Sequence, residues 1–228
     1  MSFDQNRIPI IGFDGNHRAG KGVQINLLST SLAKRGIRSL ILRGDGSRPG
    51  FGDCEGDPYS PWWQNFKQYV KECTNEYDAW CVGARRLMGE AASRIAEQKN
   101  PQKTVILFDR ARISRAQMTL KEGLPLSFET MYRNVGHDNY NDSELKNLRP
   151  NITIYLHAPA TVLLGRLSLQ DPKYDFRREN IITSQESFDH AFDALRERGE
   201  TVVSARADQD PVEAMTVIRN AIMTHNIV

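Results

Sequence analysis

The stretch Gly15-Asn16-His17-Arg18-Ala19-Gly20-Lys21-Gly22 decides the fold, because it separates two segments of different periodicity. Before it, Ile8 to Phe13 is a short apolar run of the kind that forms a strand buried on both faces. After it, Lys21 to Arg35 repeats apolar residues at helical spacing and stops at Gly36, a residue type that commonly ends helices. The sequence therefore predicts a strand, a glycine-rich turn and a helix in direct succession.

A glycine-rich turn in this position, with a lysine at its end, is typical of phosphate-binding loops. Its glycines let several backbone N–H groups point at one anion, and the helix that follows adds the partial positive charge of its N-terminus. Lys21 would reach the β- and γ-phosphates of ATP. The predicted ATP contacts are Gly15, Asn16, His17, Arg18, Ala19, Gly20, Lys21, Gly22 and Val23.

The loop departs from the usual pattern at one position that matters for a metal ion. Gly22 stands where a Ser or Thr hydroxyl normally binds Mg²⁺. A Mg²⁺ ion would then be held by ATP oxygens, by water and by a carboxylate from another part of the chain. ATP and Mg²⁺ are the expected cofactors.

Four further apolar runs have the length of buried strands, and helix-like segments separate them. The runs are Ile37 to Leu42, Val105 to Phe108, Ile152 to Leu156 and Thr201 to Val203. The helical segments are Tyr77 to Gln98, Ala160 to Leu169 and Pro211 to Met223. Five strands with helical crossovers predict a single α/β domain over residues 1–228, with a five-stranded parallel sheet and helices on both of its faces.

Two polar segments fit neither pattern. Gly44 to Pro61 is rich in glycine, proline and acidic residues, and Gln170 to Asn180 is polar with Arg177 and Arg178 near its end. We predict irregular loops for both, and long irregular loops in compact domains are often functional.

Composition excludes several classes of protein. The formal net charge of the 228 residues is +2, well below that of a dedicated nucleic-acid binder. No apolar run approaches the roughly 20 residues that cross a bilayer, and the polar N-terminus does not resemble a secretion signal. Cys54, Cys73 and Cys81 have neither metal-ligand spacing nor an even count. We expect reduced thiols in a cytoplasmic protein.

Three motifs together resemble thymidylate kinases. Arg18-Ala19-Gly20-Lys21 is similar to the Asp-Arg-Ala-Gly-Lys loop of one group of that family, with His17 in place of the aspartate. Phe108-Asp109-Arg110, followed by Ser114, resembles the family's Asp-Arg-Tyr motif with its serine. Pro150 to Leu156 is similar to the family's fourth strand.

The resemblance extends from Ile8 to Met223 and implies both a fold and an activity. The implied fold is that of a P-loop kinase with a short lid at about 170–180. The implied reaction moves the γ-phosphoryl group of ATP to a nucleoside monophosphate, either dTMP or a modified pyrimidine deoxynucleotide. A homodimer is implied as well, with Tyr59 to Met88 as its interface.

The resemblance also implies roles for single residues. Asp109 would bind Mg²⁺ through water, and Arg110 would hold the phosphate of the acceptor. Arg18 would bridge the donor and acceptor phosphates, while Arg177 and Arg178 would close over ATP from the lid. The predicted catalytic residues are Arg18, Lys21, Asp109, Arg110, Arg177 and Arg178.

The acceptor site is less well determined. Either Arg43 or Arg48 matches the family's second phosphate-binding arginine, and either Arg85 or Arg86 matches its base-contacting arginine. The position of the base-stacking phenylalanine falls beside Trp80, so the base pocket is predicted to be rebuilt while the phosphate-binding residues remain. The predicted acceptor contacts are His17, Arg43, Arg48, Trp80, Arg85, Arg86, Arg110 and Ser114.

Two other functions stay open at the level of sequence. The acceptor would instead be a hydroxyl group of a nucleoside, of a natural product or of a modified base in DNA, and nucleic acid would be a partner only in that case. Alternatively, the departures at His17 and Gly22-Val23 would indicate a nucleotide sensor that has lost catalysis.

Overall fold

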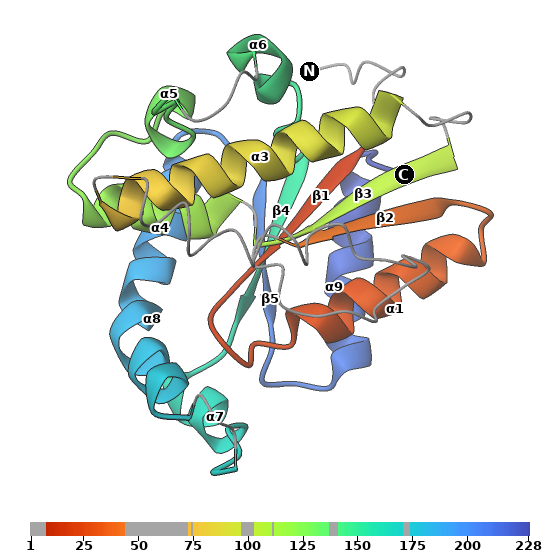
Figure 1. Cartoon of the computed structure of the whole chain (residues 1–228). Helices are drawn as coiled ribbons and strands as arrows, with labels where there is room; N and C mark the ends of the chain where they lie inside the picture. Colours follow the sequence, from red (N-terminus) through yellow and green to blue (C-terminus); the bar gives the residue numbers. More distant parts are fainter. Residues whose placement is uncertain are drawn as a thin grey trace.

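A single parallel sheet forms the centre of the molecule. The computed structural model describes residues 8–43, 73, 75–96, 103–110, 112–136, 141–170 and 174–228. The sheet has the order β2-β3-β1-β4-β5, and every neighbouring pair is parallel (Figure 1). Its strands are β1 (Ile10–Asp14), β2 (Arg38–Arg43), β3 (Thr104–Asp109), β4 (Ile152–His157) and β5 (Val202–Arg206). The five predicted strands and the α/β class are confirmed.

Eight helices surround this sheet in the described part of the chain. Four of them correspond to predicted helices: α1 (Lys21–Ala33), α3 (Glu76–Ala96), α7 (Ala160–Gly165) and α9 (Pro211–Thr224). The other four have no counterpart in the sequence prediction: α4 (Arg112–Lys121), α5 (Phe128–Met131), α6 (Asp142–Lys146) and α8 (Tyr174–Glu197).

The prediction of an irregular lid loop from Gln170 to Asn180 is wrong for most of that segment. Helix α8 begins at Tyr174, so Arg177 and Arg178 lie in its opening turns. The first fully buried residue of this helix is Ile181. Because the preceding turns face solvent, they carry charged side chains, and the sequence pattern therefore resembles a loop.

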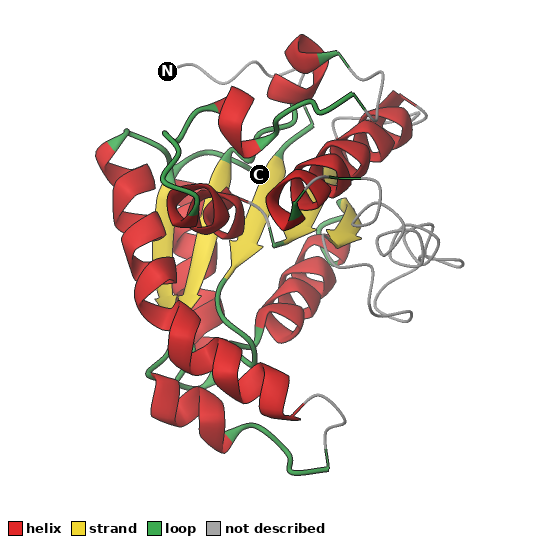
Figure 2. Ribbon diagram, turned by 60° about the vertical axis from the view of Figure 1, so that its left-hand side comes forward, coloured by secondary structure: helices red, strands yellow, loops and turns green. Residues whose placement is uncertain are grey.

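Alternate residues of each strand face two separate apolar cores. In β1, Ile10 belongs to the core beneath α3, α4 and α8, whereas its neighbour Ile11 belongs to the core beneath α1 and α9. Figure 2 shows the sheet lying between these two layers of helices. The sheet is therefore buried on both faces, which explains why its strands appear in the sequence as continuous apolar runs.

Helix α8 packs at one end of the sheet and contributes to both cores. Ile181, near its N-terminal end, packs into the α1 and α9 core. Phe188 and Leu195, further along, pack into the opposite core, and this half of α8 lies against α4 (Figure 1). The helix thereby reaches from the α3 and α4 layer to the loop that follows β1.

Strand register brings the predicted functional segments to one edge of the sheet. Phe13 in β1 and Arg43 in β2 are both in register with Asp109 in β3, and Asp14 is in register with Tyr155 in β4. All these residues lie at carboxyl ends of parallel strands. The turn after β1 and the connection after β3 are therefore neighbours, at the edge where ligands commonly bind in α/β sheets.

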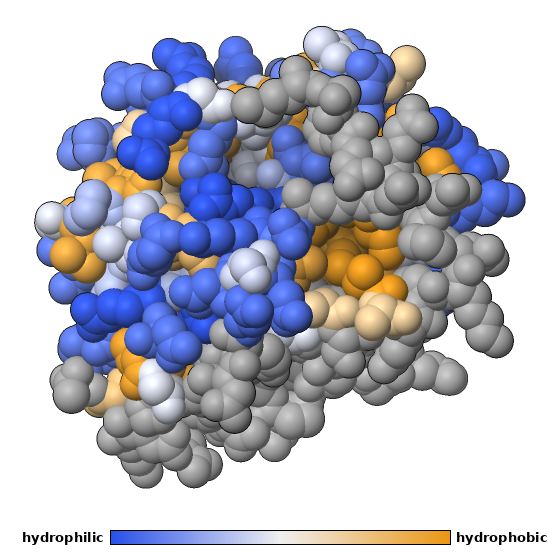
Figure 3. All heavy atoms as spheres, turned by 90° about the horizontal axis from the view of Figure 1, so that it is seen from above, coloured by the Kyte–Doolittle hydropathy of each residue, from blue (hydrophilic) through white to orange (hydrophobic). Residues whose placement is uncertain are grey.

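Several predictions fall outside the described residues. They concern the whole Gly44 to Pro61 loop, with Arg48 and Cys54, and the Tyr59 end of the predicted dimer interface. Cys73 and Cys81 are not joined in a disulfide bond in the described part of the chain. In the described part of the chain no helix is long and apolar enough to cross a membrane. Seen from above (Figure 3), much of the described surface is polar, with an apolar area beside the grey atoms.

Candidate active site

The turn after β1 requires glycine at both ends. Gly15 has a φ of +142°, and a Cβ atom added to it would lie 2.4 Å from the carbonyl oxygen of Leu156 in β4. Gly20 has a φ of +80°, a left-handed conformation that glycine adopts without a steric penalty. The turn can therefore lie directly against β4 and lead into α1 at Lys21.

Two arginines share the left-handed conformation, which is uncommon for residues with a side chain. Arg18 in the turn has a φ of 63°, and Arg110 after β3 has a φ of 64°. Such backbone strain of about 1 to 3 kcal/mol per residue is often found at functional sites. The Arg110 N–H donates to the carbonyl of Phe13 at 2.8 Å, which fixes Arg110 beside the turn.

Lys21 lies with its ammonium group against the turn itself. Its Nζ donates to the carbonyl oxygens of Gly15 at 2.9 Å and Asn16 at 3.0 Å. The side chain is almost fully buried, and no side chain caps the N-terminus of α1 at Gly20. The backbone N–H groups of the first turn of α1 and the ammonium of Lys21 are thus combined at one place, which favours an anion.

Asp14 connects the end of β1 to the start of α4. Its carboxylate is fully buried and accepts hydrogen bonds from the N–H groups of Ile113 at 2.8 Å and Ser114 at 3.2 Å, and from the Ser114 hydroxyl. Burial raises the pKa of Asp14, while these hydrogen bonds and the charge of Lys21 oppose that rise. Ser114, a predicted acceptor contact, is thus placed with its hydroxyl directed into the fold.

Asn16 connects the turn to α8. Its Nδ2 donates to the carbonyl of Ile181 at 3.2 Å and to Oε1 of Gln185 at 3.4 Å. Its Oδ1 accepts the N–H of His17 at 2.7 Å and the hydroxyl of Ser184 at 3.3 Å. The sequence indicated a backbone role only, and this side chain instead fixes the position of the turn relative to α8.

Asp109 has the properties of a ligand to a divalent cation. It ends β3, and its Oδ1 is buried without a hydrogen-bond partner among the described residues. The same residues contain no cluster of three or more His, Cys, Asp or Glu side chains that would hold a metal without help. One available carboxylate beside a phosphate-binding turn fits Mg²⁺, which is commonly held by one or two carboxylates together with phosphate oxygens and water.

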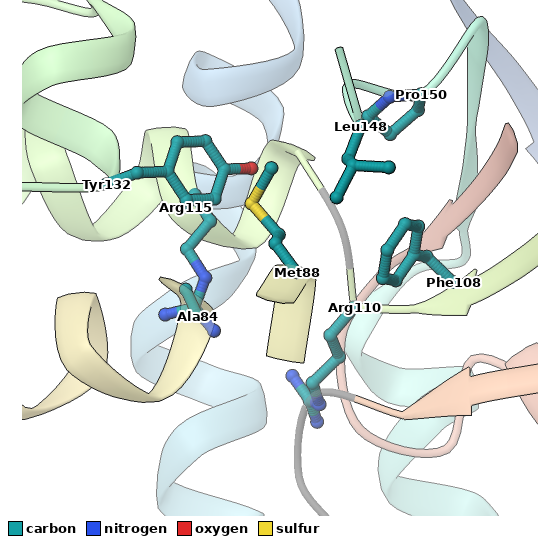
Figure 4. Close-up of a pocket in the computed structure, with 8 residues that line it drawn as sticks. All are labelled: Ala84, Met88, Phe108, Arg110, Arg115, Tyr132, Leu148 and Pro150. Carbon is teal, nitrogen blue, oxygen red and sulfur yellow. The ribbon is translucent and has the colours of Figure 1, made fainter. Parts of the chain in front are cut away.

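A small pocket, partly open to solvent, lies beside Arg110. Two arginines and mainly apolar side chains line it: Ala84, Met88, Phe108, Arg110, Arg115, Tyr132, Leu148 and Pro150. In Figure 4 the guanidinium groups of Arg110 and Arg115 lie toward one end, and Leu148 and Pro150 lie toward the other. On its other side Arg110 approaches the turn, with Nη2 3.5 Å from Nδ1 of His17.

Arg85, one of the two predicted arginines of α3, does not line this pocket. Arg85 is fully buried, and its Nη1 donates to the carbonyl of Tyr132 at 3.0 Å and to Asp142 at 2.6 Å. These contacts hold α3 against the end of α5 and the start of α6 and give Arg85 a place in the packing of the fold. The side chains of Arg43 and Arg86 lie outside the described part of the structure.

Arg115 lines the pocket, and the sequence analysis did not identify it. Its side chain is buried, its Nη1 donates to the carbonyl of Trp80 at 3.2 Å, and its guanidinium lies 5.3 Å from the centre of the Trp80 ring. The helix α4 that carries it was itself not predicted. Its position shortly after the Asp-Arg pair could have identified Arg115 as a candidate, because residues that follow the end of β3 start at the same edge of the sheet.

The arginines of α8 lie in the opening turns of a helix that contacts the turn after β1. Phe176, next to Arg177, makes an edge-on ring contact with His17, with ring centres 6.3 Å apart. Arg177 is half-buried and Arg178 is exposed. The start of α8 therefore borders the phosphate-binding turn, and the pocket borders it through Arg110.

Comparison with known proteins identifies this fold. No protein-family model matches the sequence, and no curated protein is significantly similar to it in sequence. The structure is similar to that of the thymidylate kinase from Candida albicans, whose description refers to the origin of broad substrate specificity. The match has a TM-score of 0.57 and 19% sequence identity, and it covers 97% of this chain and 93% of the other. The chain has a P-loop kinase fold of the thymidylate kinase type.

Proposed function

We propose that this chain is an ATP-dependent kinase that phosphorylates a nucleoside monophosphate, with a pyrimidine deoxynucleotide such as dTMP as the acceptor. The position of Arg110 carries this proposal. The same guanidinium lines the pocket and approaches His17 in the phosphate-binding turn. A donor phosphate at the turn and an acceptor phosphate at the mouth of the pocket would both lie within its reach.

The charged groups of the site match the needs of phosphoryl transfer. An oxygen of the acceptor phosphate would attack the γ-phosphorus of ATP, and the bond to the β–γ bridging oxygen would break, giving ADP and a nucleoside diphosphate. The acceptor phosphate is largely a dianion at neutral pH, so no side chain has to remove a proton. Lys21, Arg18 and Arg110 would hold the reacting groups in line and offset the negative charge.

Asp109 is the residue that would hold Mg²⁺, directly or through a bound water. When bound, the ion would offset part of the charge of the phosphates. Gly22 provides no hydroxyl ligand, and the Asp109 carboxylate, with a buried oxygen that has no partner among the described residues, is suited to the ion. Arg177 and Arg178, at the start of α8, would approach ATP from the lid.

The proposal is tested by measuring ADP release from ATP and Mg²⁺ with a panel of acceptors. The panel contains dTMP, dUMP, 5-hydroxymethyl-dUMP, dCMP, the purine monophosphates, free nucleosides and DNA with modified pyrimidines. We expect turnover with at least one pyrimidine monophosphate, and a loss of at least 100-fold in the Lys21→Ala variant, which lacks a charge at the reacting phosphates.

Turnover with nucleosides or DNA alone would contradict a monophosphate acceptor. Binding of ATP without acceptor-dependent release of ADP would contradict the kinase itself. Binding is measured separately by the shift in melting temperature with ATP, so that a variant that fails to fold is distinguished from an inactive one.

A further inference from the structure

Arg115 has more N–H donors than it has hydrogen-bond partners among the described residues. Its exposed fraction is 6%. Among the described residues it makes one hydrogen bond, from Nη1 to the carbonyl of Trp80. A guanidinium has five N–H donors, and burying such a group without partners is costly. Its remaining donors are therefore available to a ligand in the pocket that it lines.

The surroundings hold the Arg115 guanidinium in one orientation. The Trp80 ring lies 5.3 Å from it, and the Trp80 carbonyl accepts from Nη1. A stacked aromatic ring restricts one face of a guanidinium and leaves the donors in its plane accessible. Trp80, which the sequence suggested as a wall of the acceptor site, acts here as the residue that positions Arg115.

The charges around the pocket favour an occupant that supplies hydrogen-bond acceptors. Its lining contains Arg110 and Arg115 and no carboxylate among the described residues. Burial lowers the pKa of Arg115, and the nearby positive charge of Arg110 contributes in the same direction. A ligand with acceptor atoms facing Arg115 would offset both the burial of its guanidinium and the repulsion from Arg110. A ligand with an N–H donor at that place would make both less favourable.

We propose that Arg115 is the residue that selects the base of the acceptor nucleotide, by donating to an edge of the ring that presents acceptor atoms. This inference rests on the proposed function, in which Arg110 holds the acceptor phosphate and the base enters the pocket. Arg115 takes the role that the sequence assigned to Arg85 or Arg86. On a pyrimidine the acceptor is either the oxygen at position 4, as in uracil and thymine, or the N3 and O2 pair of cytosine.

The matched acceptors dUMP and dCMP differ at these atoms, so the ratio of their kcat/KM values is the test. We expect the wild-type chain to discriminate between them by roughly 10- to 100-fold, the range for a good charged contact to a base. Preference for dUMP would identify the position 4 oxygen, and preference for dCMP the N3 and O2 pair. In Arg115→Met the ratio is expected to fall to within about threefold of one, with partial discrimination in Arg115→Lys.

Arg85→Met is the matched control, because Arg85 is also a buried arginine, and its Nη1 donates from α3 to the Tyr132 carbonyl. It is expected to lower the melting temperature and to reduce turnover of dUMP and dCMP by the same factor. An unchanged ratio in folded Arg115→Met and Arg115→Lys would overturn the assignment of Arg115 alone. Absence of turnover by the wild-type chain with every monophosphate would overturn the proposed function, and this inference with it.

Discussion

A single buried carboxylate, that of Asp14, connects three parts of the site. Asp14 ends β1, and its carboxylate accepts hydrogen bonds from the first turn of α4. The positive charge of Lys21 acts to lower the pKa of Asp14, against the larger effect of burial. The start of α4 in turn determines where Arg115 lies. The placement of both the phosphate-binding turn and the pocket therefore depends on one side chain that would not itself contact a substrate.

Asp14→Ala is expected to lower the free energy of unfolding by about 2 to 4 kcal/mol, because it leaves the N–H groups of Ile113 and Ser114 buried without an acceptor. Asp14→Asn keeps an acceptor oxygen of the same size and is expected to lose about half as much. Urea denaturation of both variants measures the difference. Equal stability of Asp14→Ala and the wild-type chain would show that these hydrogen bonds contribute nothing to the fold.

Single residues differ in how far the sequence could identify them. The sequence could place Lys21 and Asp109 at the same edge of the sheet, because each belongs to a local motif at the end of a strand. The role of Asn16 could not be predicted, since its partners Ile181 and Gln185 are remote in the sequence. Arg85 and Arg115 are both arginines on helical segments, and only the three-dimensional packing shows that Asp142 pairs with the first while the second faces a pocket.

At the scale of elements, the contact between the turn after β1 and α8 joins two parts of the proposed ATP site. The Asn16 side chain makes three hydrogen bonds at this contact, to the Ile181 carbonyl and to the Ser184 and Gln185 side chains of α8. Arg177 and Arg178 lie before these partners on the same helix. The position of both arginines relative to ATP is therefore set partly through Asn16.

Asn16→Ala is expected to lower kcat/KM for ATP by roughly tenfold, a loss equivalent to about 1.4 kcal/mol, because the hydrogen bonds between the turn and α8 are removed. Discrimination between acceptor bases is expected to stay unchanged, since Asn16 does not line the pocket. Thr183→Ala is the control, because the Thr183 hydroxyl bonds only within α8, to the Glu179 carbonyl. Wild-type kinetics for Asn16→Ala would rule out this role.

Helices and strands could be predicted where burial produces a regular spacing of apolar residues in the sequence. The strands are buried on both faces, and α1 and α9 each bury one side against the sheet, so their patterns are visible in the sequence. The opening turns of α8 are exposed and charged, and α5 and α6 are too short for any period to appear. Their boundaries depend on caps such as Ser127 and Asn141 and on tertiary contacts.

At the scale of the whole molecule, the parallel sheet gathers residues from distant parts of the chain at one edge. The turn after β1, Asp109 and Arg110 after β3, and the pocket between α3 and α4 meet there. Phe176 of α8 contacts His17 in the turn, and Arg110, which lines the pocket, approaches the same His17. We propose that ATP at the turn and the acceptor in the pocket meet at this point.

The most direct test is to follow the γ-phosphoryl group itself. The chain is incubated with Mg²⁺, with ATP labelled at the γ-phosphate and with the monophosphate that gives the fastest ADP release, and the products are separated and identified by mass. We predict that the label appears as the β-phosphate of the nucleoside diphosphate, in amounts equal to the ADP formed. Label recovered as inorganic phosphate, or on a sugar or base hydroxyl of the acceptor, would contradict this account.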